Sequence, residues 1–145
     1  MKALIQRVKK ASVTIGGELY SEINAGLLVF LGVTKNDGKE NAENLAQKIL
    51  KLRIFEDENE KMNFSISDIQ GEILVVSQFT LCADCSKGTR PGFDSAAQPN
   101  RANELYEDFV SHLKTSGLTV KTGKFRAMMD VALVNDGPVT ILLEK

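Results

Sequence analysis

The sequence predicts a mixed α/β fold: one β-rich domain in a layered β/β/α arrangement, with a partly barrel-like sheet and two main helices. About eight segments show the alternating or continuously apolar patterns typical of strands, whereas two show helical periodicity. Two helices can cover only one face of so many strands, which favours a curved sheet with both helices in a single layer. The 145 residues contain no internal repeat, linker or low-complexity tract, so we expect one domain over residues 1–145.

The first strands are predicted by two patterns. Apolar and hydroxyl side chains alternate over residues 11–15, and a Gly16-Gly17 pair separates them from a second extended pattern over Glu18–Ile23, which predicts a β-hairpin. Residues 26–33 form a continuous apolar run of strand length, which favours a central strand covered on both faces. A further strand is expected over residues 72–81, with residues 73–76 as its buried part.

Two segments carry apolar residues at the spacing of a buried helix face. The first helix is expected to begin at residues 39–41 and to end near Leu52. The second is expected to begin at Pro99, because proline suits the first helical turn, and to end at Gly117. Residues 87–99 show no periodicity and form the longest predicted loop, and such loops in compact domains are often functional.

The C-terminal part predicts strands over residues 118–124, 128–134 and 139–143. Asn135-Asp136-Gly137-Pro138 interrupts the extended pattern between the last two. Glycine has no Cβ and proline has no N–H, so we expect bare backbone at a turn with rigid flanks. The turn has two interpretations: a simple reversal of the chain, or a recognition surface made of exposed carbonyls.

Composition and charge exclude several classes of function. The net charge is -1, which does not indicate a strongly basic nucleic-acid binder. No apolar run approaches the length of a membrane span, and the N-terminus lacks the pattern of a signal peptide, so we expect a cytoplasmic protein without a membrane partner. Cys82 and Cys85 have two residues between them, but a zinc site needs about four ligands. The single histidine is His112, so we interpret both cysteines as plain thiols and expect no metal or cofactor.

The usual catalytic patterns are missing from the sequence. His112 falls on the second predicted helix, at the edge of its apolar stripe, and no nucleophile elbow, dinucleotide fingerprint or P-loop is present. Small polar side chains do gather at the end of the strand over residues 72–81, in the run Ser77-Gln78-Phe79-Thr80-Leu81. They could satisfy local backbone groups, or they could form a site of backbone amides with Thr80 as a nucleophile.

This run, together with Asn135-Asp136-Gly137-Pro138-Val139-Thr140, resembles the two signature motifs of the D-aminoacyl-tRNA deacylases, formerly called D-tyrosyl-tRNA deacylases. The resemblance extends along the chain. It includes Gln6-Arg7-Val8, Lys61-Met62-Asn63, Gly88-Arg90-Pro91-Phe93 and Gly123-Lys124-Phe125. The two cysteines are not part of the pattern.

The resemblance implies a cytoplasmic, homodimeric, tRNA-binding hydrolase that proofreads chirality. Such an enzyme cleaves the ester between a D-amino acid and the terminal adenosine of tRNA, and it also acts on glycyl-tRNA, including mischarged tRNA-Ala. In the family the Gly-Pro bond is cis, and the pair inserts into the active site of the other subunit. Gly137 and Pro138 would then reject L-amino acids sterically through their carbonyls. Without the resemblance we would expect a trans bond, since cis bonds are a small minority of X-Pro bonds.

The resemblance also implies roles for individual residues. Ser77, Gln78, Phe79 and Thr80 would form the catalytic floor, where backbone amides hold the carbonyl oxygen. Phe125 and Met129 would line the adenosine pocket, and Arg7, the third substrate-binding residue, would fix the Gly-Pro turn through bonds to carbonyls. The 2′-OH of the tRNA would assist the attacking water, because the sequence shows no protein base.

Four further expectations concern charge and alternative functions. Lys87, Arg90 and Arg101 are candidates for phosphate contacts, and the acidic run over residues 56–60 should face away from RNA. One alternative function is an esterase or amidase with Thr80 as the nucleophile, or with Ser77 in that role. The other is a non-catalytic module for RNA binding or dimerisation.

Overall fold

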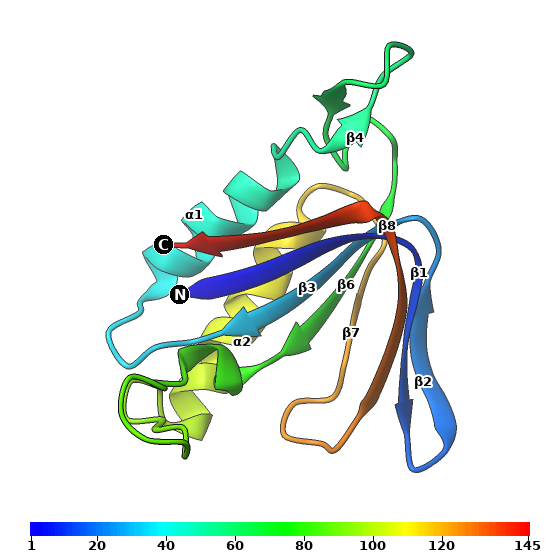
Figure 1. The fold of residues 1–145 in the computed structure, drawn as a ribbon. Coiled ribbons are helices and arrows are strands. Elements are labelled where there is room, and N and C mark those ends of the chain that lie inside the picture. The colour runs from blue at the N-terminus through cyan, green and yellow to red at the C-terminus, as the bar shows by residue number, and fades with distance from the viewer.

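A long N-terminal strand organises the sheet (Figure 1). The computed structural model describes residues 1–145, and the strand order in the main sheet is β2-β1-β3-β6-β7, with β8 paired to the other edge of β1. The strands are β1 (Lys2–Ile15), β2 (Glu18–Ile23), β3 (Gly26–Gly32), β6 (Glu72–Ser77), β7 (Val120–Thr122) and β8 (Asp130–Glu144). β1 is long enough to pair with β3 through its first half and with β2 through its second half. The pairs β3–β6 and β6–β7 are parallel, and the others are antiparallel.

The two ends of this strand path approach each other, which makes the sheet barrel-like. The Ser21 hydroxyl of β2 donates to the Thr122 carbonyl of β7 at 2.9 Å, and Lys121 Nζ donates to the Glu22 carbonyl at 2.8 Å. Seven buried apolar side chains fill the curved interior: Val8, Ala11, Val13, Ile23, Leu28, Leu74 and Val76. The expected curved sheet is therefore confirmed.

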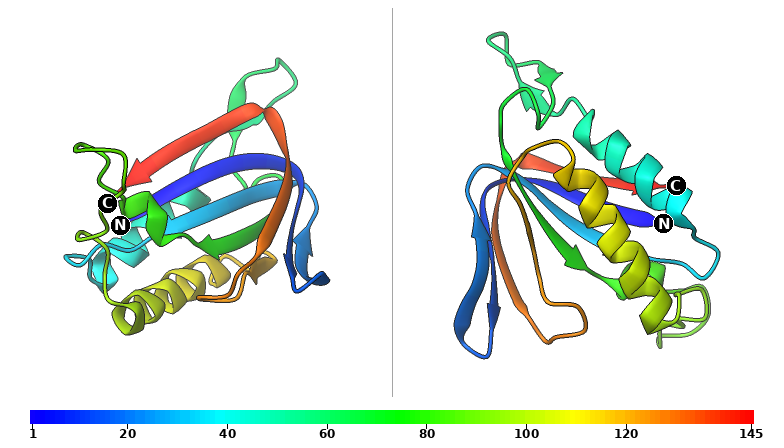
Figure 2. Two further views of the ribbon diagram at one scale, coloured as in Figure 1. Left: turned by 60° about the horizontal axis from the view of Figure 1, so that its bottom comes forward. Right: turned by 180° about the vertical axis from the view of Figure 1, so that it is seen from behind.

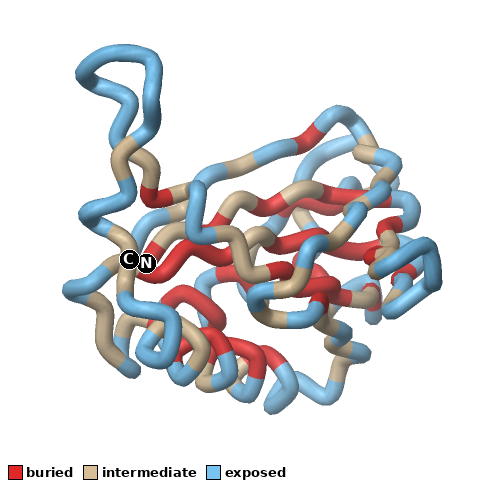
Figure 3. The backbone as a smooth tube through the Cα atoms, turned by 90° about the horizontal axis from the view of Figure 1, so that it is seen from below, coloured by how far each residue is buried: buried red, intermediate tan, exposed pale blue.

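Both helices cover the opposite face of the sheet, as the view from behind shows (Figure 2). They are α1 (Lys39–Leu50) and α2 (Pro99–Lys114), close to their expected bounds. Each buries its apolar stripe: Ala42, Leu45, Ala46 and Ile49 from α1, and Leu105, Tyr106, Phe109, Val110 and Leu113 from α2. Buried residues accordingly lie along the strands and on the inner sides of the helices (Figure 3). Neither helix combines the length and the apolar composition that crossing a membrane requires.

A small antiparallel ribbon extends from the α1 end of the molecule (Figure 1). It consists of β4 (Phe55–Glu56) and β5 (Met62–Phe64), joined by the acidic turn. Phe55 is buried and anchors the ribbon to the core, whereas Glu56 is exposed.

The strand expected over residues 72–81 is shorter than predicted. β6 ends at Ser77, and a 3-10 helix, η1 (Phe79–Cys82), follows it. The Gln78 N–H still donates to the Leu31 carbonyl at 2.8 Å, but the Leu81 N–H already bonds back to the Gln78 carbonyl. This local bonding turns the chain out of the sheet. The strands expected over residues 118–124 and 128–134 are likewise shorter at one or both ends, since β7 covers Val120–Thr122 and β8 begins at Asp130.

The expected break at the Gly-Pro pair is wrong. β8 runs as one strand, Asp130–Glu144, through Gly137-Pro138, and its pairing with β1 shifts register on either side of Val8. The Gly137-Pro138 bond is cis. The side chain of Asn135 spans the detour, because its Oδ1 accepts from the Val139 N–H at 2.7 Å and its Nδ2 donates to the Val139 carbonyl at 3.2 Å. The Asn135 side chain therefore provides the hydrogen-bond partners that β1 does not offer to the backbone of Val139.

Candidate functional site

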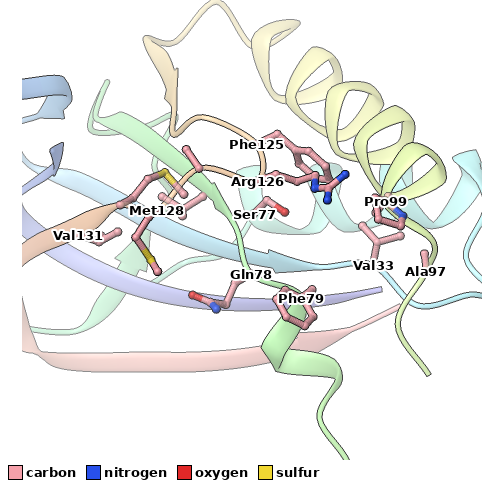
Figure 4. A pocket seen from close by; sticks show the side chains of 14 residues that line it. Val33, Ser77, Gln78, Phe79, Ala97, Pro99, Phe125, Arg126, Met128 and Val131 are labelled. Carbon is pink, nitrogen blue, oxygen red and sulfur yellow. The ribbon is translucent and has the colours of Figure 1, made fainter. Parts of the chain in front are cut away.

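A cavity with a volume of about 530 Å³ lies where β6 leaves the sheet (Figure 4). Three parts of the chain form it: the end of β6, the first turns of α2, and the loop between β7 and β8. The lining is mostly apolar. The lining residues are Val33, Val76, Ser77, Gln78, Phe79, Ala97, Pro99, Ala102, Phe125, Arg126, Ala127, Met128, Met129 and Val131. The sequence-predicted residues Ser77, Gln78, Phe79, Phe125 and Met129 thus meet in one cavity.

One side of the cavity is backbone at the start of η1. The N–H groups of Phe79 and Thr80 precede the first 3-10 bond, and they donate to no group within the chain. The Phe79 side chain is exposed and packs on Phe93, with 4.9 Å between the ring centroids. Two backbone donors without a partner in the chain therefore stand at the point where the strand ends.

Thr80 does not line the cavity. Its side chain is exposed, and its Oγ1 accepts a hydrogen bond from the Gln78 amide. No carboxylate, histidine, cysteine or lysine belongs to the lining, in which Arg126 is the one ionisable side chain. The cavity therefore offers no side-chain base that could activate the hydroxyl of Thr80.

The opposite wall is the loop between β7 and β8. Gly123 donates its N–H to the Val75 carbonyl at 2.9 Å, and Met129 Sδ accepts from the Lys124 N–H at 3.4 Å. A Cβ on Gly123 would lie 2.9 Å from Met129 Sδ, so glycine permits this close approach. Phe125 packs against Tyr106 of α2, with 5.9 Å between their centroids. The loop is in this way fixed to both sheet and helix.

Two features of this loop were not predicted from the sequence. Arg126 adopts a positive φ of 62°, a conformation that few non-glycine residues adopt, and Met128 is 93% exposed. Two lysines and an aromatic residue closely precede Arg126 in the sequence, which is a weak signal for RNA contact. The positive φ of Arg126 has no corresponding signal in the sequence.

Gly137 and Pro138 lie away from this cavity. Arg7, next to the turn, stands opposite Leu27 of β3, which in turn pairs with Ile73 at the start of β6. The cavity begins three residues further along β6, at Val76, which is about 10 Å at the usual rise per residue, and the strands between add about 14 Å across the sheet. Both residues of the turn are exposed. One chain therefore does not bring the two signature segments together.

Arg7 fixes the position of the Gly-Pro turn through a hydrogen bond to its backbone. The side chain is buried, its Nε donates to the Asp136 carbonyl at 2.8 Å, and its Nη1 donates to the Ile54 carbonyl at 2.6 Å. Its Nη2 lies 3.5 Å from a Glu56 carboxylate oxygen. The expected bond from Arg7 to a carbonyl of the turn is present, and it lies outside the cavity.

The remaining candidates lie elsewhere. Lys87 and Arg90 are exposed in the long loop, and Arg101 pairs with Glu104 at 2.9 Å. Cys82 is buried and Cys85 is exposed, both as free thiols, and burial raises the pKa of the Cys82 thiol. No cluster of three or more His, Cys, Asp and Glu side chains is arranged to hold a metal ion.

The chain is similar over its whole length to proteins of one family. The family model described as D-Tyr-tRNA(Tyr) deacylase matches residues 4–144. A D-aminoacyl-tRNA deacylase from Thermodesulfovibrio yellowstonii is 57% identical over 143 residues, which are 99% of this chain and 98% of the relative. The protein of the same name from Clostridioides difficile is 58% identical over 144 residues, which are 99% of this chain and 97% of the relative.

Two solved structures have the same fold. One, described as c-Myc DNA Unwinding Element Binding Protein, superposes with a TM-score of 0.94 at 46% identity and covers 100% of this chain and 99% of its own. The other, a probable eukaryotic D-amino acid tRNA deacylase, has a TM-score of 0.85 at 15% identity, covering 98% of this chain and 97% of its own. The second likeness concerns the fold alone.

Proposed function

This chain belongs to the D-Tyr-tRNA(Tyr) deacylase family, and from that premise we propose that it hydrolyses the ester between a D-amino acid and the terminal adenosine of tRNA. It is a hydrolase of the D-aminoacyl-tRNA deacylase type. Its substrates are D-aminoacyl-tRNA and glycyl-tRNA, including glycine mischarged on tRNA-Ala, and its products are the free amino acid and tRNA. It acts in the cytoplasm, where charged tRNA is used.

The cavity is the site for the terminal adenosine. Its volume of about 530 Å³ lies within the usual range for small-ligand sites, and most of its lining is apolar. Phe125 offers a ring for stacking or edge contact with the base, and Met129 adds an adaptable apolar surface. The aminoacyl group then extends toward the end of β6.

The free N–H groups of Phe79 and Thr80 stabilise the reaction. As water attacks the ester carbonyl, negative charge develops on its oxygen, and donors that need no reorganisation lower the barrier. Ser77 and Gln78 shape the same floor. This role uses the backbone of residues 77–80 and does not require the Thr80 hydroxyl.

The substrate supplies the proton transfer. No carboxylate, histidine or lysine lines the cavity, so the 2′-OH next to the ester is the nearest group able to accept a proton from water. Water oxygen bonds to the carbonyl carbon, the bond to the ribose 3′ oxygen breaks, and the proton passes through the 2′-OH to that leaving oxygen. The RNA therefore assists its own deacylation.

Chirality is read by a second copy of the chain. Gly137 and Pro138 are exposed, are held by Arg7, and lie too far from their own cavity to contact its substrate. In a homodimer they reach the cavity of the partner subunit, where their carbonyls occupy the space that an L side chain needs. A rigid backbone obstacle rejects that side chain strongly, whereas glycine has none to reject.

The observation that carries the proposal is the cavity beside the start of η1, where the N–H groups of Phe79 and Thr80 have no partner within the chain and no side-chain base belongs to the lining. Its test is deacylation of one tRNA charged in turn with a D-amino acid, the matching L-amino acid and glycine. We expect hydrolysis of the D and glycyl esters, with the L ester intact. The Thr80→Ala variant should retain substantial kcat. A loss of about 1,000-fold with intact substrate binding would instead support a threonine nucleophile.

A further inference from the structure

A basic segment separates the adenosine cavity from a second hollow. We define the basic strip as residues 121–126, Lys-Thr-Gly-Lys-Phe-Arg, in which three cations and one aromatic ring occur without an acidic residue. The strip leads out of β7 and into the cavity wall. Alternation of cations with an aromatic side chain is typical of surfaces that bind single-stranded nucleic acid.

Phe125 lines both hollows, so one ring stands between them. The second hollow has a volume of about 380 Å³ and lies between α2 and the strip. Its polar lining includes Asn103, Lys114 and Lys124, and Glu107 is its only carboxylate. Two neighbouring bases can stack on opposite sides of such a ring, and the surrounding lysines favour an anionic backbone.

Two cations of the strip are free to bind a ligand. Lys124 and Arg126 have no carboxylate within 4.0 Å and make no side-chain hydrogen bond, unlike Arg101, which is paired with Glu104. Lys121 donates to a backbone carbonyl and keeps its charge uncompensated. Figure 4 shows the Arg126 side chain extending along the cavity toward the Pro99 side. Its charge therefore lies along the wall of the cavity that the proposed function assigns to the terminal adenosine.

The backbone at Arg126 gives an independent reason to look for function here. Its φ is 62°, and the Ala127 N–H bonds back to the Lys124 carbonyl at 3.2 Å, so the residue sits in a tight left-handed turn. Glycine adopts this conformation without a steric cost, whereas arginine does not. Residues held in this way cluster at binding sites.

We propose that the basic strip binds the phosphates of the single-stranded RNA immediately 5′ of the terminal adenosine, and that the second hollow receives the adjoining nucleotide. The inference rests on the proposed function for its substrate. Arg126 contacts the phosphate that joins the two nucleotides, and Lys124 contacts the next phosphate. This path differs from one over the loop that carries Lys87 and Arg90, on the other flank of the cavity.

The test compares a substrate that has these phosphates with one that lacks them. Wild type and Lys124→Gln/Arg126→Gly are assayed on D-aminoacyl-tRNA and on 3′-D-aminoacyl-adenosine, a nucleoside ester. Arg126→Gly removes the charge and relieves the left-handed turn, so the variant should fold. We expect the ratio of kcat/KM for tRNA to that for the nucleoside to fall about tenfold, and the slope of log KM against log salt to decrease by about 1.4 for two lost contacts.

Lys48→Gln/Lys51→Gln provides a matched control, because it removes two exposed charges at the far end of α1. An unchanged ratio and salt slope in the Lys124→Gln/Arg126→Gly variant would overturn the proposal, as would an equal loss in the control. If Lys87→Gln/Arg90→Gln alone lowered the ratio, the RNA would take the other flank and the proposal would be wrong.

A binding measurement separates this inference from the proposed function. If the wild-type protein hydrolysed neither ester, the proposed function would be refuted. Even in that case, binding of an uncharged 5′-phosphorylated CCA oligonucleotide would test directly whether the basic strip binds RNA. Affinity that falls about tenfold in the variant and not in the control supports the strip, and equal affinities refute it.

Discussion

Arg7 is a buried cation that connects the turn after Asn135 to two other parts of the chain. It bonds the carbonyls of Ile54 and Asp136 and lies near the Glu56 carboxylate, so its guanidinium joins β1, β8 and the β4 ribbon. The planar fork of arginine can reach three acceptors in different directions, whereas a lysine ammonium acts as a point charge. The position of the turn therefore depends on the geometry of this side chain as well as on its charge.

We predict that Arg7→Lys destabilises the fold by about 2–4 kcal/mol, because buried acceptors lose their donors. The same variant should begin to hydrolyse L-aminoacyl-tRNA, since the turn is no longer fixed. Urea unfolding and the L-ester assay measure the two effects. Lys9→Ala, at an exposed position two residues on, is the control and should change stability by less than about 0.5 kcal/mol. Full stability and full chiral strictness in Arg7→Lys would contradict the assigned role.

Gly137 is a second residue on which the geometry of the turn depends. Its φ is 140°, and a Cβ there would lie 2.7 Å from Val139 Cγ2 and 3.1 Å from Arg7 Nη2. The turn consequently has no room for a side chain beside its carbonyls. The sequence motif indicates the glycine, but the close approach of Arg7 follows only from the pairing of β1 with β8.

At the scale of elements, sequence patterns predicted what hydrophobic spacing can specify. The stripes of α1 and α2 and the apolar run of β3 are buried as expected, because burial of one face fixes their periodicity. The ends of the strands were predicted less accurately than their buried parts. Ser77 to Thr80 continue a strand-like composition, yet local bonding closes a 3-10 turn after Gln78, and composition cannot distinguish the two.

The strand β8 was misjudged for a different reason. Proline and glycine predict a break, but the amide of Asn135 bonds both backbone groups of Val139 and carries the strand past the detour. The asparagine is visible in the sequence, but the hydrogen bonds of its side chain depend on how β8 pairs with β1. The cavity shows the same limit of sequence-based prediction. Phe79 and Phe125 were predicted by resemblance to a family. Arg126 lines the cavity because it adopts a left-handed conformation, which no sequence periodicity indicates.

The turn before β6 offers a test at this scale. Asp68 Oδ2 accepts from the Ser65 N–H and from the Ser65 hydroxyl, each at 2.7 Å. The hydrogen bond from the Ser65 N–H is the main cause, and that from its hydroxyl the second, of a lowered pKa for the Asp68 carboxyl. A carboxyl whose pKa is lowered on folding stabilises the native state above its unfolded pKa, about 3.9, and loses this contribution as pH falls through the folded pKa.

Asp68→Asn should therefore lower the free energy of unfolding at pH 7. The difference from wild type should shrink as pH falls below about 4, since both proteins then carry a neutral side chain. Urea unfolding between pH 7 and pH 3 measures this difference. Asp94→Asn, which removes one exposed carboxylate without an intramolecular donor, controls for the lost charge. A difference that persists unchanged at pH 3 would show that the carboxylate is not responsible.

At the scale of the whole molecule, the sheet separates two cores and two signature segments. The helices cover one face, and the barrel-like curve encloses the smaller core on the other. The cavity opens at the carboxyl end of β6, whereas the turn lies at the level where β6 begins. The same strands that place each segment rigidly also hold them apart, so the proposed function requires a second chain to complete the site.

Mixed dimers test this arrangement. One protomer carries the cavity variant Phe125→Ala/Met129→Ala with an intact turn, and it should be inactive by itself. The other has an intact cavity and one residue inserted between Asp136 and Gly137, which should admit L-aminoacyl-tRNA. In a mixed dimer the intact turn enters the only working cavity, so L-ester hydrolysis should disappear while D-ester hydrolysis continues.

Two different affinity tags on the co-expressed chains isolate the mixed dimer, and circular dichroism confirms folding. The matched control joins the working cavity to a partner that has both the cavity substitutions and the insertion. It should still hydrolyse the L ester, because no intact turn is present. If the turn acted within its own chain, both mixed dimers would hydrolyse the L ester equally, and chiral selection across the dimer would be excluded. Suppression in the first mixture alone requires the turn of one subunit to act in the cavity of the other.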